Sequence, residues 1–147
     1  MLGCVNMIPK TCVAIKTKKF PILEGEEDEL VNEGMYGKAL CLYLENKLPL
    51  AGIKVPFFCC EDWGWWIEVN DGEFIMGLCI YSDPKAVNSP ERFAIIASIT
   101  KETKWSWSKF KKVDISDKIL KIMDTVESIF RDDNEIESTS RNDNYPF

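Results

Sequence analysis

The sequence contains no histidine. This absence excludes the Ser-His-Asp and Cys-His systems of nucleophilic enzymes, the most common general base, and the mixed histidine ligand sets of zinc and iron. No two cysteines have the C-x-x-C spacing of a cysteine-only zinc site or a thiol oxidoreductase. A glycine-rich phosphate loop of the Walker or dinucleotide type is also missing. We therefore expect a protein that is not an enzyme and needs neither cofactor nor metal.

Long apolar runs are missing too. No segment approaches the roughly 20 apolar residues that span a bilayer. Near the N-terminus, basic residues such as Lys10 and Lys16 follow the apolar stretch, whereas in a signal peptide they precede it. The sequence thus predicts a cytoplasmic protein with no membrane contact. In that reducing compartment we expect buried free thiols at Cys4, Cys12, Cys41, Cys59, Cys60 and Cys79.

The length and net charge of the chain indicate the number of domains and the kind of partner. The 147 residues have the usual length of a single domain, and a hydrophobic fraction of 46% is ordinary for a globular protein. The net charge of −6 disfavours a nucleic-acid surface, because phosphate binding needs clustered lysine and arginine. The field of such a protein would instead steer a basic partner toward it.

The first 60 residues predict one strand, one helix and one irregular extended segment. Residues 11–20 alternate and are β-branched, which indicates a strand, and their lysines suit a sheet edge. Apolar residues at helical spacing predict a helix over 35–48. Residues 53–60 are extended in character, and Pro56 makes them an edge or irregular strand.

The middle of the chain predicts consecutive antiparallel strands. Residues 63–69 and 74–81 are two apolar, β-rich runs joined by Asp71-Gly72, a strong hairpin signal. The second run is apolar on both faces, as in a central strand, and residues 93–99 predict a third strand. Alternation in the first run would place Trp63 and Trp65 in the core and Trp66 on the opposite face.

A second helix ends the predicted fold. Its apolar stripe runs to about Arg131, and Asp114 or Ser116 can cap its start. Residues 1–133 thus form a single α+β domain, with a three-stranded meander plus an N-terminal strand in an antiparallel β-sheet and two packed helices. Residues 134–147 are expected to be a polar, flexible tail, unless Ile136 adds a short terminal strand.

Acidic and aromatic residues are the candidates for a contact surface. Glu24 to Glu29 form an acidic loop, and further acids flank the hairpin. Aromatic side chains supply much of the affinity in protein interfaces, although any single tryptophan is more often a core residue. The predicted partner-binding residues are Glu26, Glu27, Asp28, Glu29, Glu61, Asp62, Trp66, Asp71, Glu73 and Trp107.

A family resemblance points the same way. The segment Glu61 to Val69, with its EDWGWWIEV sequence, and the segment Gly77 to Pro84 resemble a group of small bacterial proteins of unassigned function. They also have the general look of immunity proteins of polymorphic toxin systems. That resemblance implies a small, acidic, cytoplasmic protein that binds one cognate toxin, inhibits it by occlusion and carries no catalytic residues.

Two alternatives stay open. A small enzyme would use the carboxylates of Glu61 and Asp62 or the thiols of Cys59 and Cys60. A structural adaptor or homodimer would form through an exposed aromatic strand. The hypothesis that the sequence favours is a protein-binding inhibitor of a basic toxin, for which a nuclease is the expected activity.

Overall fold

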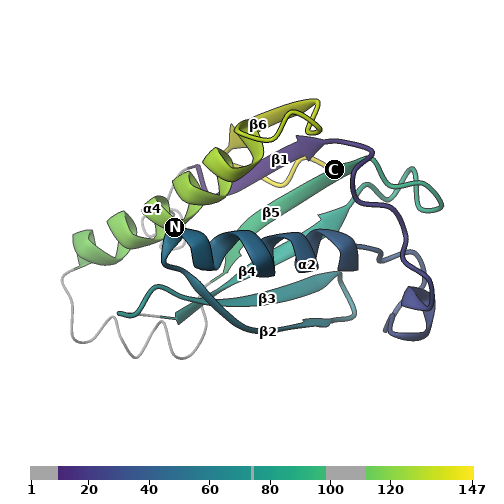
Figure 1. The fold of residues 1–147 in the computed structure, drawn as a ribbon, viewed down its shortest axis with the longest axis horizontal. Coiled ribbons are helices and arrows are strands. Elements are labelled where there is room, and N and C mark those ends of the chain that lie inside the picture. Colours follow the sequence, from purple (N-terminus) through teal and green to yellow (C-terminus); the bar gives the residue numbers. More distant parts are fainter. Residues whose placement is uncertain (1–9, 74, 99–111) are drawn as a thin grey trace, which may run out of the picture.

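An antiparallel sheet of six strands forms the centre of the computed structural model, which describes residues 10–73, 75–98 and 112–147, with the backbone alone for 112–114 (Figure 1). The strands are β1 (Cys12–Lys16), β2 (Lys54–Cys60), β3 (Trp65–Asn70), β4 (Ile75–Ser82), β5 (Arg92–Ser98) and β6 (Ser138–Asn142). They lie in the order β2-β3-β4-β5-β1-β6, and each neighbouring pair is antiparallel.

Two α-helices in the described ranges pack on the same face of this sheet (Figure 1). They are α2 (Lys38–Lys47), which continues into the 3-10 helix η2 (Leu48–Ala51), and α4 (Lys112–Arg131). A short 3-10 helix, η1 (Glu26–Asp28), precedes α2. The expected α+β class with two packed helices is confirmed. No helix in the described ranges has both the length and the apolar character to cross a membrane.

The core lies between the helices and one face of the sheet. The sheet contributes alternate residues of its strands, and the helices contribute one stripe each, as the periodicities of the two structures require. Buried members of this core are Val13, Ile15, Trp65, Ile67, Val69, Met76, Leu78, Ile80, Phe93 and Ile95 from the sheet, and Leu40, Leu44, Ile119, Met123, Val126 and Phe130 from the helices.

The sheet contains six strands, where the sequence predicted four and an edge or irregular strand at residues 53–60. β2 is the edge strand that Pro56 indicated, with a register shift between Lys54 and Phe57. β6 arises from residues 138–142, within the segment expected to be a flexible tail, and pairs along the whole of β1. The placement of the first strand at an edge is therefore wrong, because β1 lies between β5 and β6.

Alternation along β3 gives its two tryptophans different surroundings. Trp65 is 2% exposed in the core, whereas Trp66 faces the opposite side of the sheet and is half-buried. The expectation that Trp63 shares the core face is wrong. At Gly64 the backbone passes so close to β4 that a Cβ would lie 2.4 Å from the Ile80 carbonyl oxygen. The strand begins only after this approach, and the Trp63 ring packs against Tyr81 on the other face.

The five cysteines in the described ranges are free, as expected, and those at Cys12, Cys41 and Cys79 are buried. Cys59 and Cys60, which were also expected to be buried, are half-buried because they lie on the edge strand β2, and Cys4 lies outside the described residues. The expected capping residues of the second helix differ. α4 begins at Lys112, so Asp114 and Ser116 lie within the helix instead of at its start.

A carboxylate at the end of α4 connects three segments. Asp133 accepts hydrogen bonds from the Lys19 ammonium at 2.6 Å and from the Tyr43 hydroxyl at 2.7 Å. Burial opposes ionisation of Asp133, but the hydrogen bonds from Lys19 and Tyr43 outweigh it and lower the pKa of this carboxyl to about 2. The ionised carboxylate thus joins the segment after β1 to both helices.

We expect Asp133→Asn to lower the free energy of unfolding by about 1–3 kcal/mol at neutral pH, because it removes a charge from this cluster. The pKa of Asp133 is lower in the folded than in the unfolded chain, so its stabilisation is present above about pH 4 and disappears as the pH falls toward 2. Urea unfolding from pH 7 to pH 2 should show the two proteins converging in acid. A constant difference across that range would contradict this role.

Candidate functional site

Two acidic segments meet at the end of the sheet where β3 begins. The Asn32 side-chain amide donates a hydrogen bond of 2.6 Å to the Asp62 carbonyl, which connects the loop before α2 to the β2–β3 connection. The thiol of Cys60 lies between them. Burial raises the pKa of this thiol, and the carboxylates of Glu26, Glu61 and Glu29 raise it further. A hydrogen bond from the Val31 backbone lowers the pKa but does not outweigh these effects. Carboxylates from both segments, Glu29 and Glu61, therefore act electrostatically on the same thiol.

We call this surface the acidic rim. It consists of the carboxylates of Glu24, Glu27, Asp28, Glu29, Glu33, Glu61 and Asp62. All are exposed except Glu61, which is half-buried. Five of these residues were predicted from the sequence: Glu27, Asp28, Glu29, Glu61 and Asp62. The links between the two segments are the hydrogen bond from Asn32 to Asp62 and the common effect of Glu29 and Glu61 on the Cys60 thiol.

Glu26 does not belong to this surface. The sequence predicted it as a contact residue, but its side chain is only 1% exposed. One carboxylate oxygen accepts the Leu23 N–H, and the other accepts the N–H groups of Gly37 and Lys38 at the start of α2. A carboxylate is favourable there because the first N–H groups of a helix lack partners within the helix. Glu26 is a structural residue that fixes the loop to α2.

The acidic rim has little basic compensation. Residues 24–33 and 61–62 contain no lysine or arginine. Among the described residues, the one ion pair to the rim joins Lys38 to Glu29. An apolar side chain, Val31, lies within the same loop and is 58% exposed. Val31 and Glu33 were not among the contact residues predicted from the sequence. Their position directly after the acidic run could have identified both.

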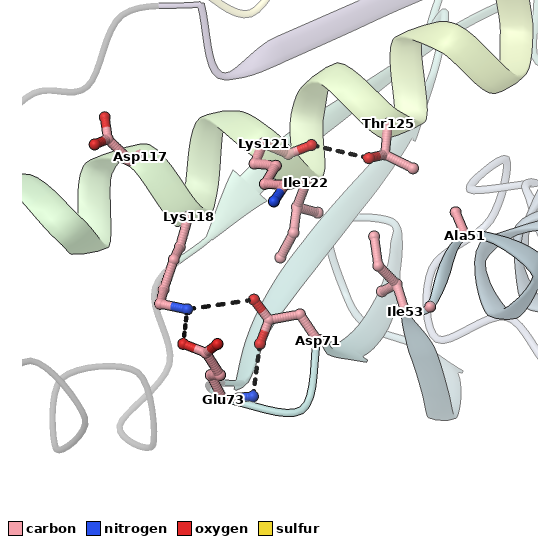
Figure 2. Close-up of a pocket in the computed structure, with 10 residues that line it drawn as sticks. Ala51, Ile53, Asp71, Glu73, Asp117, Lys118, Lys121, Ile122 and Thr125 are labelled. Carbon is pink, nitrogen blue, oxygen red and sulfur yellow. Dashed lines mark hydrogen bonds and ion pairs between the residues drawn. The ribbon is translucent and has the colours of Figure 1, made fainter.

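Asp71 and Glu73 lie elsewhere. The six residues of β3 separate them from Glu61 and Asp62, a distance of about 20 Å along the strand. Figure 2 shows both carboxylates in the β3–β4 turn with Lys118 of α4 directed toward them. The three side chains line a cavity of about 550 Å³ that also contains Lys121. Because lysines balance these acids, the two residues do not extend the acidic rim.

Of the two tryptophans predicted as contact residues, the structure describes only Trp66. The six-membered ring of Trp66 lies directly over Gly77, where a Cβ would come within 1.9 Å of it. This position is on the sheet face away from the helices and next to Glu61, which lines the same hollow. Trp107 lies outside the described residues.

The thiols next to the rim are not activated. The Cys59 thiol donates a hydrogen bond of 3.5 Å to the Glu61 carboxylate. Burial and this hydrogen bond raise the pKa of Cys59 to about 11, so the thiol stays protonated at neutral pH. A nucleophilic cysteine needs a lowered pKa. The described residues contain no group of three or more histidine, cysteine or acidic side chains arranged to hold a metal ion.

Comparison with known proteins identifies no relative. No protein-family model matches this chain, and neither a curated protein nor a solved structure matches it. The function is therefore inferred from the acidic rim and the surfaces around it.

The position of the rim depends on Glu26, and Glu26→Gln tests this. We expect a loss of about 1–3 kcal/mol in the free energy of unfolding, because an amide NH₂ would replace one acceptor among three backbone N–H donors. Glu27→Gln, in the same loop but exposed, should change stability by less than about 0.5 kcal/mol. Equal stability of the two variants in urea unfolding would show that the buried carboxylate does not support the loop.

Proposed function

We propose that this protein is a cytoplasmic binding inhibitor, an immunity protein that neutralises a basic bacterial toxin by covering its surface. The observation that carries the proposal is the acidic rim, where six of seven carboxylates have no ion pair to a described residue. Like charges placed together repel one another and destabilise the compact state, and a partner that supplies the opposite charge relieves this repulsion.

The composition of the rim favours a protein partner. Its carboxylates would speed the approach of a basic surface and select against acidic ones. Exposed Val31 supplies apolar contact area within the charged loop, as interfaces that exclude water require. Nucleic acid is disfavoured, since the rim would repel phosphates. A nuclease is the toxin class that suits the rim best, because its own nucleic-acid surface must be basic.

A second candidate function is the pairing of two copies along β2. This strand has a neighbour on one side only within the described sheet, and its Phe57 is 46% exposed. Lys54, Pro56 and the register shift protect the first half of this edge, but Phe57 to Cys60 are apolar and uncharged, which favours the addition of another strand there. Light scattering of the isolated protein distinguishes the candidates, because the inhibitor should be a monomer at micromolar concentration.

The direct test is co-purification of the tagged protein from its native cells, with the product of the neighbouring gene coexpressed. We expect a one-to-one complex with a basic protein that arrests growth when expressed alone and is harmless together with this chain. Recovery of the chain without a partner at both low and high salt would contradict the proposal.

Charge reversal locates the contact. Asp28→Lys with Asp62→Lys should weaken the complex by about tenfold or more at low salt and by much less at high salt, because salt screens exposed charges. The matched control, Asp117→Lys with Asp132→Lys, makes the same change in net charge on exposed positions of α4 and directly after it. Equal effects of the two double variants would show that total charge matters and that the rim is not the contact surface.

A further inference from the structure

A shallow hollow lies beside the acidic rim, on the sheet face that α2 and α4 leave uncovered. It measures about 590 Å³ and is lined by Glu61, Trp63, Trp66, Cys79, Tyr81 and Ser98. Glu61 belongs to both surfaces, so the hollow and the rim are continuous. The lining residues come from the start of β3, from β4 and from the end of β5.

The two indole rings of the hollow pack against alternate residues of β4. Gly77, Cys79 and Tyr81 follow one another on this face of the strand. Trp66 lies over Gly77, where no side chain interferes. The Trp63 ring packs against Tyr81 with their centroids 5.3 Å apart. Cys79, 8% exposed, forms the floor between the two indoles.

The chemistry of the hollow suits a cation. Aromatic faces attract positive charge, and tryptophan does so most strongly. Glu61 lines the hollow, and one of its carboxylate oxygens accepts a hydrogen bond from the Cys59 thiol. Burial raises the pKa of Tyr81, so its ring stays neutral. The described residues that line the hollow include no lysine or arginine.

We propose that this hollow binds an arginine side chain of the basic partner, with its guanidinium stacked on an indole and paired with Glu61. The inference rests on the proposed function for the source of the arginine. Arginine fits better than lysine because its planar group stacks on rings, pairs with a carboxylate through two hydrogen bonds and is weakly hydrated. Tryptophan, tyrosine and arginine also dominate the energetics of protein interfaces.

A peptide titration tests the site without the partner. A capped Gly-Arg-Gly peptide is added to the full chain, and the indole N–H resonances are followed by NMR. Saturable shifts are expected for Trp63 and Trp66. Trp65 is an internal reference, because its indole N–H donates to the Met35 carbonyl at 2.7 Å within the core. The same peptide with citrulline, which has the shape of arginine but no charge, should leave all three resonances in place.

Two matched variants test whether the Glu61 carboxylate contributes to arginine binding. Glu61→Gln keeps the shape of the side chain and should weaken arginine-peptide binding about two- to fivefold, the effect of one exposed ion pair. Glu45→Gln, a half-buried carboxylate on α2, should change nothing. Equal shifts with the citrulline peptide, or no saturable shift with the arginine peptide, would overturn the site even if a partner is recovered. If the chain binds the arginine peptide but captures no partner, the arginine site is supported and only the proposed toxin inhibition is overturned.

Discussion

The hydrogen bonds of Glu26 decide where the acidic rim lies. A carboxylate is costly to bury, and it is tolerated when donors surround it. Here three backbone N–H groups converge on it, two of them from the start of α2. Because α2 packs on the core face of the sheet, this contact fixes the loop to the rigid part of the fold. The exposed acids next to Glu26 are therefore presented from an anchored loop, which reduces the entropy lost when a partner binds.

The sheet separates the aromatic residues of the core from those that line the proposed arginine site. The helices cover one face, so alternate residues of β3 and β4 belong to the core and the others face away from it (Figure 1). Two glycines make the second face aromatic. Gly64 lets the chain approach β4 and turns Trp63 toward Tyr81, and Gly77 leaves space for the ring of Trp66. A side chain at Gly77 would displace the Trp66 ring, and one at Gly64 would clash with the Ile80 carbonyl of β4, so the hollow depends on the absence of two Cβ atoms.

The acids at the two ends of β3 have different roles. Those in the β3–β4 turn pair with Lys118 and connect the turn to α4 (Figure 2). Those at the start of the strand are largely uncompensated, and the aromatic hollow adjoins them through Glu61. Charge that is balanced within the molecule stabilises the fold, whereas charge left unbalanced on an anchored surface is available for a partner. The two groups are separated by more than a Debye length at physiological salt, about 8 Å, so they act independently.

The sequence by itself determined the α+β class, the hairpin of β3 and β4, the edge position of β2 and the approximate extent of both helices, because these follow from local periodicity and turn chemistry. It also identified the acidic loop and the separation of Trp65 from Trp66. Only the tertiary structure decided that Glu26 is buried, that Asp71 and Glu73 pair with α4, and that β6 places β1 inside the sheet. The physical reason is that each of these results depends on a contact between different elements of the fold, which the local pattern within one element does not encode.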